Sequence, residues 1–139
     1  SLDRRQRQMC IRDSSHTGNG GSGTTTYNDI YDNNADMLNG TFTAPVTGRY
    51  LVCVNVEFQG VASNHSSGVY YIITSNRNYQ RLFQPRNMSN VGVNCGLPMS
   101  QIVDADANDV IRWAMYIAGG SKVITMNATT TNFGVHLLS

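Results

Sequence analysis

The strictest constraint on the fold is a run of alternating residues between positions 50 and 58. Apolar side chains occupy every second position there, namely Tyr50, Val52, Val54, Val56 and Phe58. A period of two places all five on one face of a β-strand, whereas a helix would scatter them around its axis. The chain also contains a single glutamate and a single lysine. Because helical proteins usually cover their solvent face with these two residue types, the sequence predicts a β-protein.

Shorter apolar runs separated by turn residues continue this pattern along the chain. The stretch 60–68 reads as a turn-rich loop that contains His65, and 104–109 reads as a turn. Strands of this length and spacing predict an all-β sandwich or barrel. Beside the run at 50–58, strands are expected at 69–74, 82–83, 91–93, 99–103, 110–117, 123–126 and 133–138.

Length and charge exclude several classes of protein. The 139 residues allow one domain. No apolar run approaches the roughly 18 residues of a membrane helix, so membrane insertion is not expected. Charged residues make up 14% of the chain and the net charge is +1. This balance argues against a nucleic-acid partner, which calls for a wide basic surface.

The first residues of the chain do not share the strand pattern. Residues 4–14 read RRQRQMCIRDS and resemble the translation of a transposase sequencing adapter. The match predicts a sequence assembled from environmental DNA whose true upstream part is lost. Such segments are set aside before the fold is considered. We therefore expect an adapter-derived or disordered tail at 1–14, a flexible Gly/Ser/Thr segment at 15–26 and one domain at 27–139.

The most specific motif lies between residues 40 and 50 and reads GTFTAPVTGRY. It resembles the signature of the complement C1q globular-head family. In that pattern Phe42 ends one strand, Pro45 and Gly48 shape a corner, and Tyr50 begins the next strand. Proline lacks a backbone donor and suits a corner, and glycine tolerates a positive φ.

Two further segments support the resemblance, which covers about residues 27–139. Residues 107–110 lie where the family has Gly-Asp-x-Val before a late strand, with Asn108 in place of the usual glycine. Phe133 begins a segment that resembles the closing strand. The family implies a jelly-roll β-sandwich of about ten antiparallel strands, shared with tumour necrosis factor. Trp113, on the expected strand 110–117, is assigned with Tyr50 to its core.

The resemblance also implies a non-enzymatic homotrimer. In the strand 69–74, Tyr70 and Ile72 alternate with Val69, Tyr71 and Ile73, so one set is expected to face a neighbouring subunit. No catalytic residue set emerges, because none of the three histidines has a carboxylate near it in the sequence to orient it.

Three aspartates in the turn 104–109 raise the question of a metal site. Asp104, Asp106 and Asp109 offer clustered oxygens of the kind that calcium prefers. The spacing does not follow the EF-hand, which requires a glycine where Asp109 stands and a glutamate where Met115 stands. A polar turn without cofactor is the favoured interpretation. Calcium remains the alternative, since some members of the resembled family bind it near the trimer axis.

The cysteines leave the redox compartment open. Beyond the adapter-like segment the chain has two of them, Cys53 in the alternating run and Cys95 beside a glycine. A disulfide requires Cα atoms about 4.4–6.8 Å apart, which a sequence does not show. Two free, buried thiols are the favoured interpretation.

A recognition role is assigned to residues that look exposed. Arg77, Tyr79 and Arg81 combine bidentate donors with an aromatic surface, as recognition surfaces often do, and His65 is added from the loop at 60–68. A solvated loop without function is the alternative. A cell-surface glycan or protein would suit these residues as a partner.

The low charge and the long segment between Tyr31 and Phe42 resemble the versions of this domain on phage tail fibres. The sequence is therefore interpreted as a trimeric binding head at the tip of a tail fibre or other virion protein that contacts a host surface. A secreted bacterial adhesin or matrix module and a purely structural trimerisation cap are the alternatives. The expected location is the virion or the extracellular space.

Overall fold

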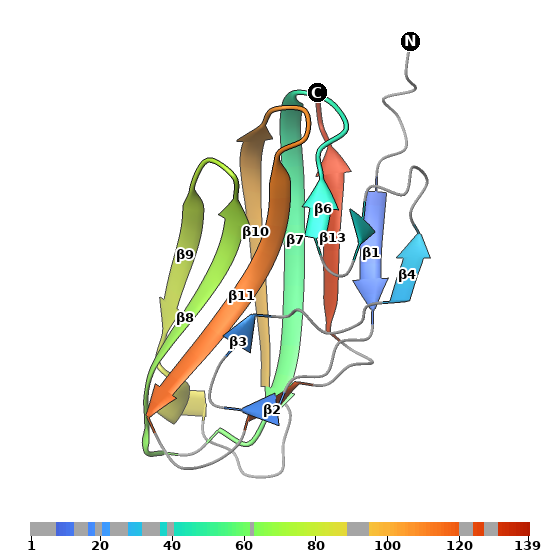
Figure 1. Cartoon of the computed structure of the whole chain (residues 1–139). Helices are drawn as coiled ribbons and strands as arrows, with labels where there is room; N and C mark the ends of the chain where they lie inside the picture. The colour runs from blue at the N-terminus through green and yellow to red at the C-terminus, as the bar shows by residue number, and fades with distance from the viewer. Residues whose placement is uncertain are drawn as a thin grey trace.

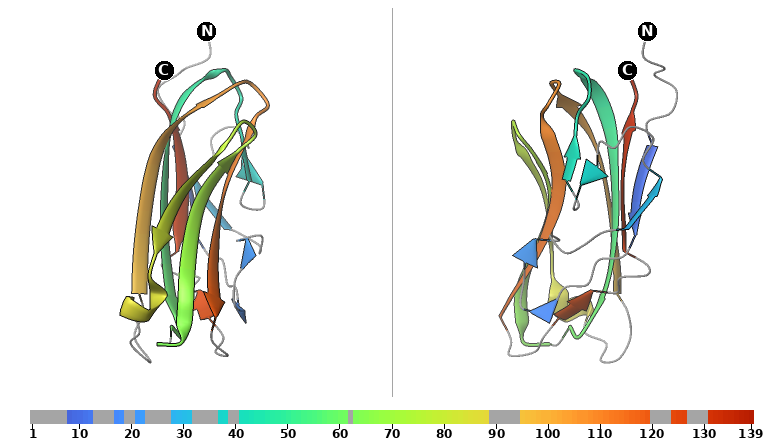
Figure 2. Two further views of the ribbon diagram at one scale, coloured as in Figure 1. Left: turned by 90° about the vertical axis from the view of Figure 1, so that its left-hand side faces the viewer. Right: turned by 45° about the vertical axis from the view of Figure 1, so that its right-hand side comes forward.

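The protein folds into two antiparallel β-sheets that pack face to face (Figure 1). The structure is a computed structural model, and Figure 2 shows its two layers from two further sides. The side chains described are those of 41–61, 63–88, 95–118 and 131–139. The residues that the structure describes are 8–12, 17–18, 21–22, 28–31, 37–38, 41–61, 63–88, 95–119, 124–126 and 131–139.

The first sheet is built around β7 (Gly48–Gln59), which contains the alternating run. It pairs with β10 (Cys95–Ala105) over eleven registered residues and with β13 (Asn132–Leu137) over six. β13 in turn pairs with β1 (Gln8–Arg12). The sheet is completed by β2 (Thr17–Gly18), β4 (Asn28–Tyr31) and β12 (Ile124–Met126).

The second sheet is built around the pair β8 (His65–Thr74) and β11 (Val110–Gly119). β9 (Asn78–Phe83) lies at its edge beside β8, and a 3-10 turn, η1 (Pro85–Met88), follows β9. The stretch from 78 to 81, for which a loop was the alternative, is therefore part of a strand. Three short strands complete the sheet, namely β3 (Gly21–Ser22), β5 (Met37–Leu38) and β6 (Thr41–Thr43).

The predicted all-β antiparallel sandwich is confirmed, but the expected number of strands is corrected. Seven strands of the described chain are five residues or longer, rather than about ten. The expected strand at 99–103 is the second half of a longer strand that begins at Cys95. The expected strand at 91–93 falls outside the described residues. Pairing with the long β7 extends β10 beyond its own apolar pattern, since the backbone of any residue except proline can both donate and accept in the ladder.

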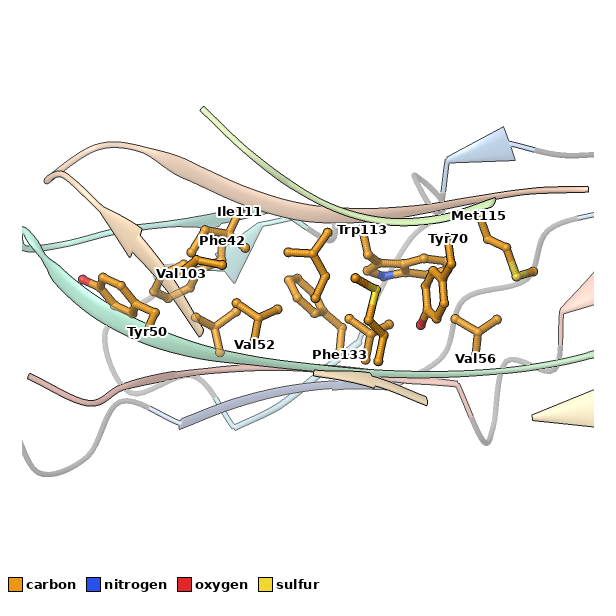
Figure 3. Packing of buried hydrophobic residues seen from close by; sticks show 14 of the residues in the cluster. Phe42, Tyr50, Val52, Val56, Tyr70, Val103, Ile111, Trp113, Met115 and Phe133 are labelled. Carbon is orange, nitrogen blue, oxygen red and sulfur yellow. The ribbon is translucent and has the colours of Figure 1, made fainter. Parts of the chain in front are cut away.

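The core fills the space between the two sheets (Figure 3). All five apolar residues of the alternating run are at most 2% exposed, so the period-two pattern does mark the inner face of β7. Trp113 packs edge-on against Tyr70, with their ring centroids 6.3 Å apart. Phe42 packs against Tyr50 in the same way at 5.5 Å. Phe42, Tyr50, Trp113 and Phe133 are each at most 1% exposed.

The corner between β6 and β7 depends on Gly48 for a reason other than the one expected. Positive φ occurs among the described residues at Gly60 and Asn108, and not at Gly48. A Cβ atom on Gly48 would lie 2.5 Å from the backbone oxygen of Ser139 and 2.9 Å from Leu137. The position requires a small residue because another segment approaches it closely. Pro45 is half-buried in the same corner.

Asn108 explains one departure from the resembled family. Its φ is 75°, in the left-handed region. Asparagine adopts this conformation more readily than most other residues that carry a Cβ. The residue therefore takes over the usual glycine's role in the turn between β10 and β11.

In the part of the chain that is described, no helix is long and apolar enough to span a membrane.

Candidate recognition surface

Three turns and residue 139 meet at one end of the sandwich, the upper end in Figure 1, which we call the loop end. The turns are 44–47, 75–77 and 106–109. Side chains tie them together: the Asn76 amide donates to Asp109 at 2.8 Å, and Ser75 accepts from the Val110 amide at 2.9 Å. The Ala107 amide donates to Thr47 at 3.1 Å. The loop end is therefore a hydrogen-bonded unit formed by segments far apart in the sequence.

An open depression of about 400 Å³ lies in the loop end. On its wall the Arg49 guanidinium donates two hydrogen bonds to Asp104, at 2.8 Å through Nε and at 3.4 Å through the second nitrogen. Both side chains are more than half exposed. The depression is lined by Thr47, Gly48, Arg49, Asn76, Asp104, Ala105, Asp106 and Ser139.

The Arg49–Asp104 pair shifts both pKa values in the direction that favours the charged forms. The hydrogen bond from Arg49 lowers the pKa of Asp104 below its usual 3.8, and the bond to Asp104 raises the pKa of Arg49. The pair is therefore ionised at neutral pH. Because both groups are exposed to water, it adds little to stability and its main effect is to hold two side chains in one orientation.

The predicted cluster on β9 is brought together only in part. The Arg77 guanidinium lies over the Tyr79 ring, 5.0 Å from its centroid, which is a cation–π geometry. Arg77 is exposed, whereas Tyr79 is half-buried and packs against the core. Arg81 is exposed and lies opposite Tyr70 in the ladder between β8 and β9. Arg77 follows Asn76, a residue that lines the depression, in the chain, but neither Arg77 nor Tyr79 is part of the lining.

His65 is not on an exposed loop. It is the first residue of β8 and its side chain is fully buried. The loop before it is shorter than the sequence indicated, because β8 begins four residues before the apolar run of that strand. A single buried histidine among serines and glycine carries no periodic pattern, so sequence reasoning had no means to separate it from the loop.

The three aspartates of the turn do not converge as ligands of one ion. Asp104 binds Arg49, while Asp109 accepts hydrogen bonds from the Asn76 amide and from the backbone amide of Asp106 at 2.9 Å. Within the described residues no group of three or more His, Cys, Asp or Glu side chains is placed to hold a metal ion. The residues present do not fit a calcium site, and the turn is held by hydrogen bonds instead.

Cys53 and Cys95 are both free thiols. They lie on adjacent strands but opposite different residues, since Cys53 pairs with Ser100 and Cys95 with Phe58. The expectation that both are buried is wrong for Cys53, which is exposed on the outer face of β7. Cys95 is half-buried, which raises the pKa of its thiol, and it donates to the Met88 carbonyl at 3.2 Å.

Two mostly apolar rows lie on the outer faces of the sandwich, and sequence reasoning had named only Val69 of their members as a residue that could face a neighbouring subunit. On the second sheet, Tyr116, Val69 and Leu82 lie side by side across β11, β8 and β9; we call this the β9 row. Leu82 is 68% exposed and Tyr116 is 45% exposed. Of the two alternating sets on β8, Tyr70 and Ile72 are buried in the core. The set that faces outward is therefore Val69, Tyr71 and Ile73.

The corresponding row on the first sheet crosses β10, β7 and β13. Ile102, Leu51 and His136 are opposite one another in the ladder, and we call them the β10 row. Ile102 is 51% exposed. The sequence did not single it out, because it lies inside the apolar run 99–103 that was expected to form a buried strand. The two rows therefore lie on opposite faces of the molecule.

Comparison with known proteins extends the description of the fold. No family model matches the sequence, and no curated protein is significantly similar to it. Among solved structures, the chain is similar to the globular domain of zebrafish complement 1qA protein, with 14% identity and a TM-score of 0.67 over 96% of this chain and 98% of that one. It is similar to murine APRIL, with 10% identity and a TM-score of 0.65 over 94% and 98%.

A third similar structure is the Eiger TNF of S. frugiperda, with 11% identity and a TM-score of 0.62 over 96% of this chain and 92% of that one. At such identities the likeness concerns the fold alone. The predicted jelly-roll β-sandwich of the C1q and tumour necrosis factor type is thereby confirmed.

Proposed function

We propose that the chain is a trimeric, non-enzymatic binding head whose loop end contacts a partner on a host surface. The observation that carries this proposal is the contrast between the two parts of the molecule. The sandwich is a closed apolar core, whereas the loop end gathers exposed Arg, Asn and Asp side chains on a hydrogen-bonded frame. Recognition residues commonly occupy loops that a rigid sheet positions.

The proposed trimer uses the two apolar rows. A cyclic trimer with a head-to-tail interface brings two different surfaces of each chain together. The β9 row and the β10 row are two such surfaces, and each contains an aliphatic residue more than half exposed. We expect the β9 row of one subunit to pack against the β10 row of the next. The trimers known in the C1q and tumour necrosis factor families support this assembly.

The finer assignment is the tip of a phage tail fibre or another virion protein. It rests on the low charge and on the length of the segment between Tyr31 and Phe42. A secreted bacterial adhesin or matrix module and a structural trimerisation cap are the competing assignments. The fibre tip and the secreted module both place the domain outside the cell. These two assignments and the structural cap all use the same trimer.

The oligomeric state is tested by light scattering at micromolar concentration. The wild-type domain should have the mass of a trimer. Leu82→Lys and Ile102→Lys should each give monomers, because a lysine in either row buries an unpaired charge at the interface. Asn87→Lys, on the exposed η1 turn, is the matched control and should remain a trimer. A monomeric wild type, or a trimer that survives both row variants, would contradict the proposed assembly.

Recognition is tested with a triple variant in which Arg77, Tyr79 and Arg81 are replaced by alanine. Binding of the fluorescently labelled trimer to a panel of bacterial cells should be lost, while circular dichroism shows a folded protein and the trimer mass stays unchanged. The melting temperature should fall modestly, because Tyr79 packs against the core. Arg86→Ala, a single exposed arginine on η1, is the control. If the triple variant binds as the wild type does, the recognition surface lies elsewhere. If the wild type binds none of the cells, the structural cap becomes the better assignment.

A further inference from the structure

The depression in the loop end presents hydrogen-bond donors and acceptors side by side. Arg49 and the Asn76 amide donate, the carboxylates of Asp104 and Asp106 accept, and the hydroxyl of Thr47 does both. The groups come from the three turns of the loop end and from the strands β7 and β10. An arrangement of this kind suits a ligand whose own groups both donate and accept.

The charge of the lining excludes several ligand classes. One guanidinium against two carboxylates leaves a formal charge of −1, which repels phosphate, sulfate and carboxylate ligands. The positive charge of Arg49 is moreover neutralised by its ion pair with Asp104. A metal ion is not accommodated, because no described group of three or more ligating side chains is present. The remaining hydrogen-bonding capacity fits an uncharged polar ligand.

We propose that this depression is a binding site for a neutral saccharide, an inference that rests on the proposed function and deepens it. Adjacent hydroxyls of a sugar ring can donate to the Asp104 and Asp106 carboxylates and accept from Arg49 and Asn76. The two hydrogen bonds between Arg49 and Asp104 hold both groups in place before the ligand arrives, which lowers the entropic cost of binding. The volume of the depression, about 400 Å³, is within the range of small-molecule sites.

The shallow, open form of the depression predicts weak binding to each single copy. In a trimer, three copies at the same end of the assembly would bind a polymeric glycan together, and the effective concentration of the second and third site raises the overall affinity. Arg77, which follows the lining residue Asn76 in the chain, is exposed and offers a longer glycan a further donor.

The test is a titration of the ¹⁵N-labelled domain with four neutral disaccharides: lactose, maltose, mannobiose and diacetylchitobiose. At millimolar concentrations at least one should shift the amide signals of residues 47–49, 76 and 104–106. 3′-Sialyllactose, which adds a carboxylate to lactose, should bind more weakly than lactose. Asp104→Asn and Arg49→Ala should each weaken binding about tenfold or more, in keeping with the loss of a charged hydrogen bond. Arg86→Ala should leave it unchanged.

Each result decides the matter separately from the proposed function. The inference is overturned if none of the four sugars shifts these signals, if the shifts map to other residues, or if the two variants bind like the wild type. Circular dichroism and melting temperature show that the variants are folded. A domain that is monomeric in light scattering but still shows these shifts would contradict the trimer and leave the saccharide site standing. A trimer without shifts would do the reverse.

Discussion

The hydroxyl of Tyr50 donates a hydrogen bond of 2.5 Å to the backbone carbonyl of Val46, four residues earlier in the chain. The bond crosses the corner between β6 and β7. The Tyr50 ring is fully buried against Phe42, and its hydroxyl bonds to the backbone at the corner where the chain turns from β6 into β7. A single residue thereby links the core to the corner of the loop end.

Replacement of Tyr50 by phenylalanine should keep the ring and remove this bond. The expected loss in the free energy of unfolding is about 1 kcal/mol, because the Val46 carbonyl loses a partner in a partly buried corner. Urea denaturation measures it. Tyr116→Phe, at a tyrosine that is 45% exposed, is the control and should change little. Equal stability of Tyr50→Phe and wild type would show that water replaces the bond at no cost.

Gly48→Ala should destabilise the domain by about 1–3 kcal/mol, the usual cost of forcing an extra carbon into a close-packed site. The new Cβ would lie 2.5 Å from the backbone oxygen of Ser139, and backbone moves less readily than a side-chain tip. Gly96→Ala is a matched control in the neighbouring β10, because its nearest contact would be an ordinary 3.7 Å to Glu57. Thermal unfolding of the two variants side by side tests the difference, and equal melting temperatures would refute it.

Trp113→Ala should cost about 3–5 kcal/mol, the range for a large aromatic residue removed from a core. The indole is 1% exposed and packs against Tyr70. Trp113→Phe should cost less, since it keeps most of the ring contacts. Chemical denaturation of both variants gives the comparison. A stable alanine variant that has lost only ligand binding would instead make Trp113 a contact residue.

The Arg49–Asp104 pair predicts a specific pH dependence. Because the folded protein lowers the pKa of Asp104 below 3.8, the small stabilisation by the pair is present above that pH and is lost as the pH falls through the folded value. NMR titration of the Asp104 carboxyl should give a pKa below 3.8 in the wild type. In Arg49→Ala the pKa should return to the ordinary value. An unchanged titration in that variant would show that another group sets the shift.

Deletion of residues 1–14 should leave the melting temperature unchanged, as the adapter resemblance predicts. In the structure residues 8–12 form β1 between β13 and β4. Without them β13 keeps its six-residue ladder with β7, whereas the short β4 loses its described ladder partner, so the deletion sets the adapter prediction against the β1 pairing. Deletion of residues 1–7 alone is the matched control, since it leaves β1 intact. A fall of several degrees for the longer deletion and none for the shorter would show that β1 contributes to the fold.

Much of the fold could be predicted from local pattern. The period-two run from Tyr50 to Phe58 identified the central strand and its buried face, and the motif around Pro45 located the corner. The errors have two origins: the local pattern around His65 is weak, and the alternation of β7 was not applied to Cys53. His65 was assigned to a loop because serines and glycine surround it, and Cys53 was expected to be buried although the outer face of its strand is open to solvent.

The candidate site was less predictable than the core, because it is formed by residues that lie far apart in the sequence. Arg77 and Tyr79 are two residues apart, so a contact between them needs no distant segment of the chain. Arg49 and Asp104 are fifty-five residues apart, and only the ladder between β7 and β10 makes them neighbours. The sequence by itself determined which residues alternate and hence the sheet faces. The tertiary structure decided strand register and the packing of the turns, and these two together decide which polar side chains meet at the loop end.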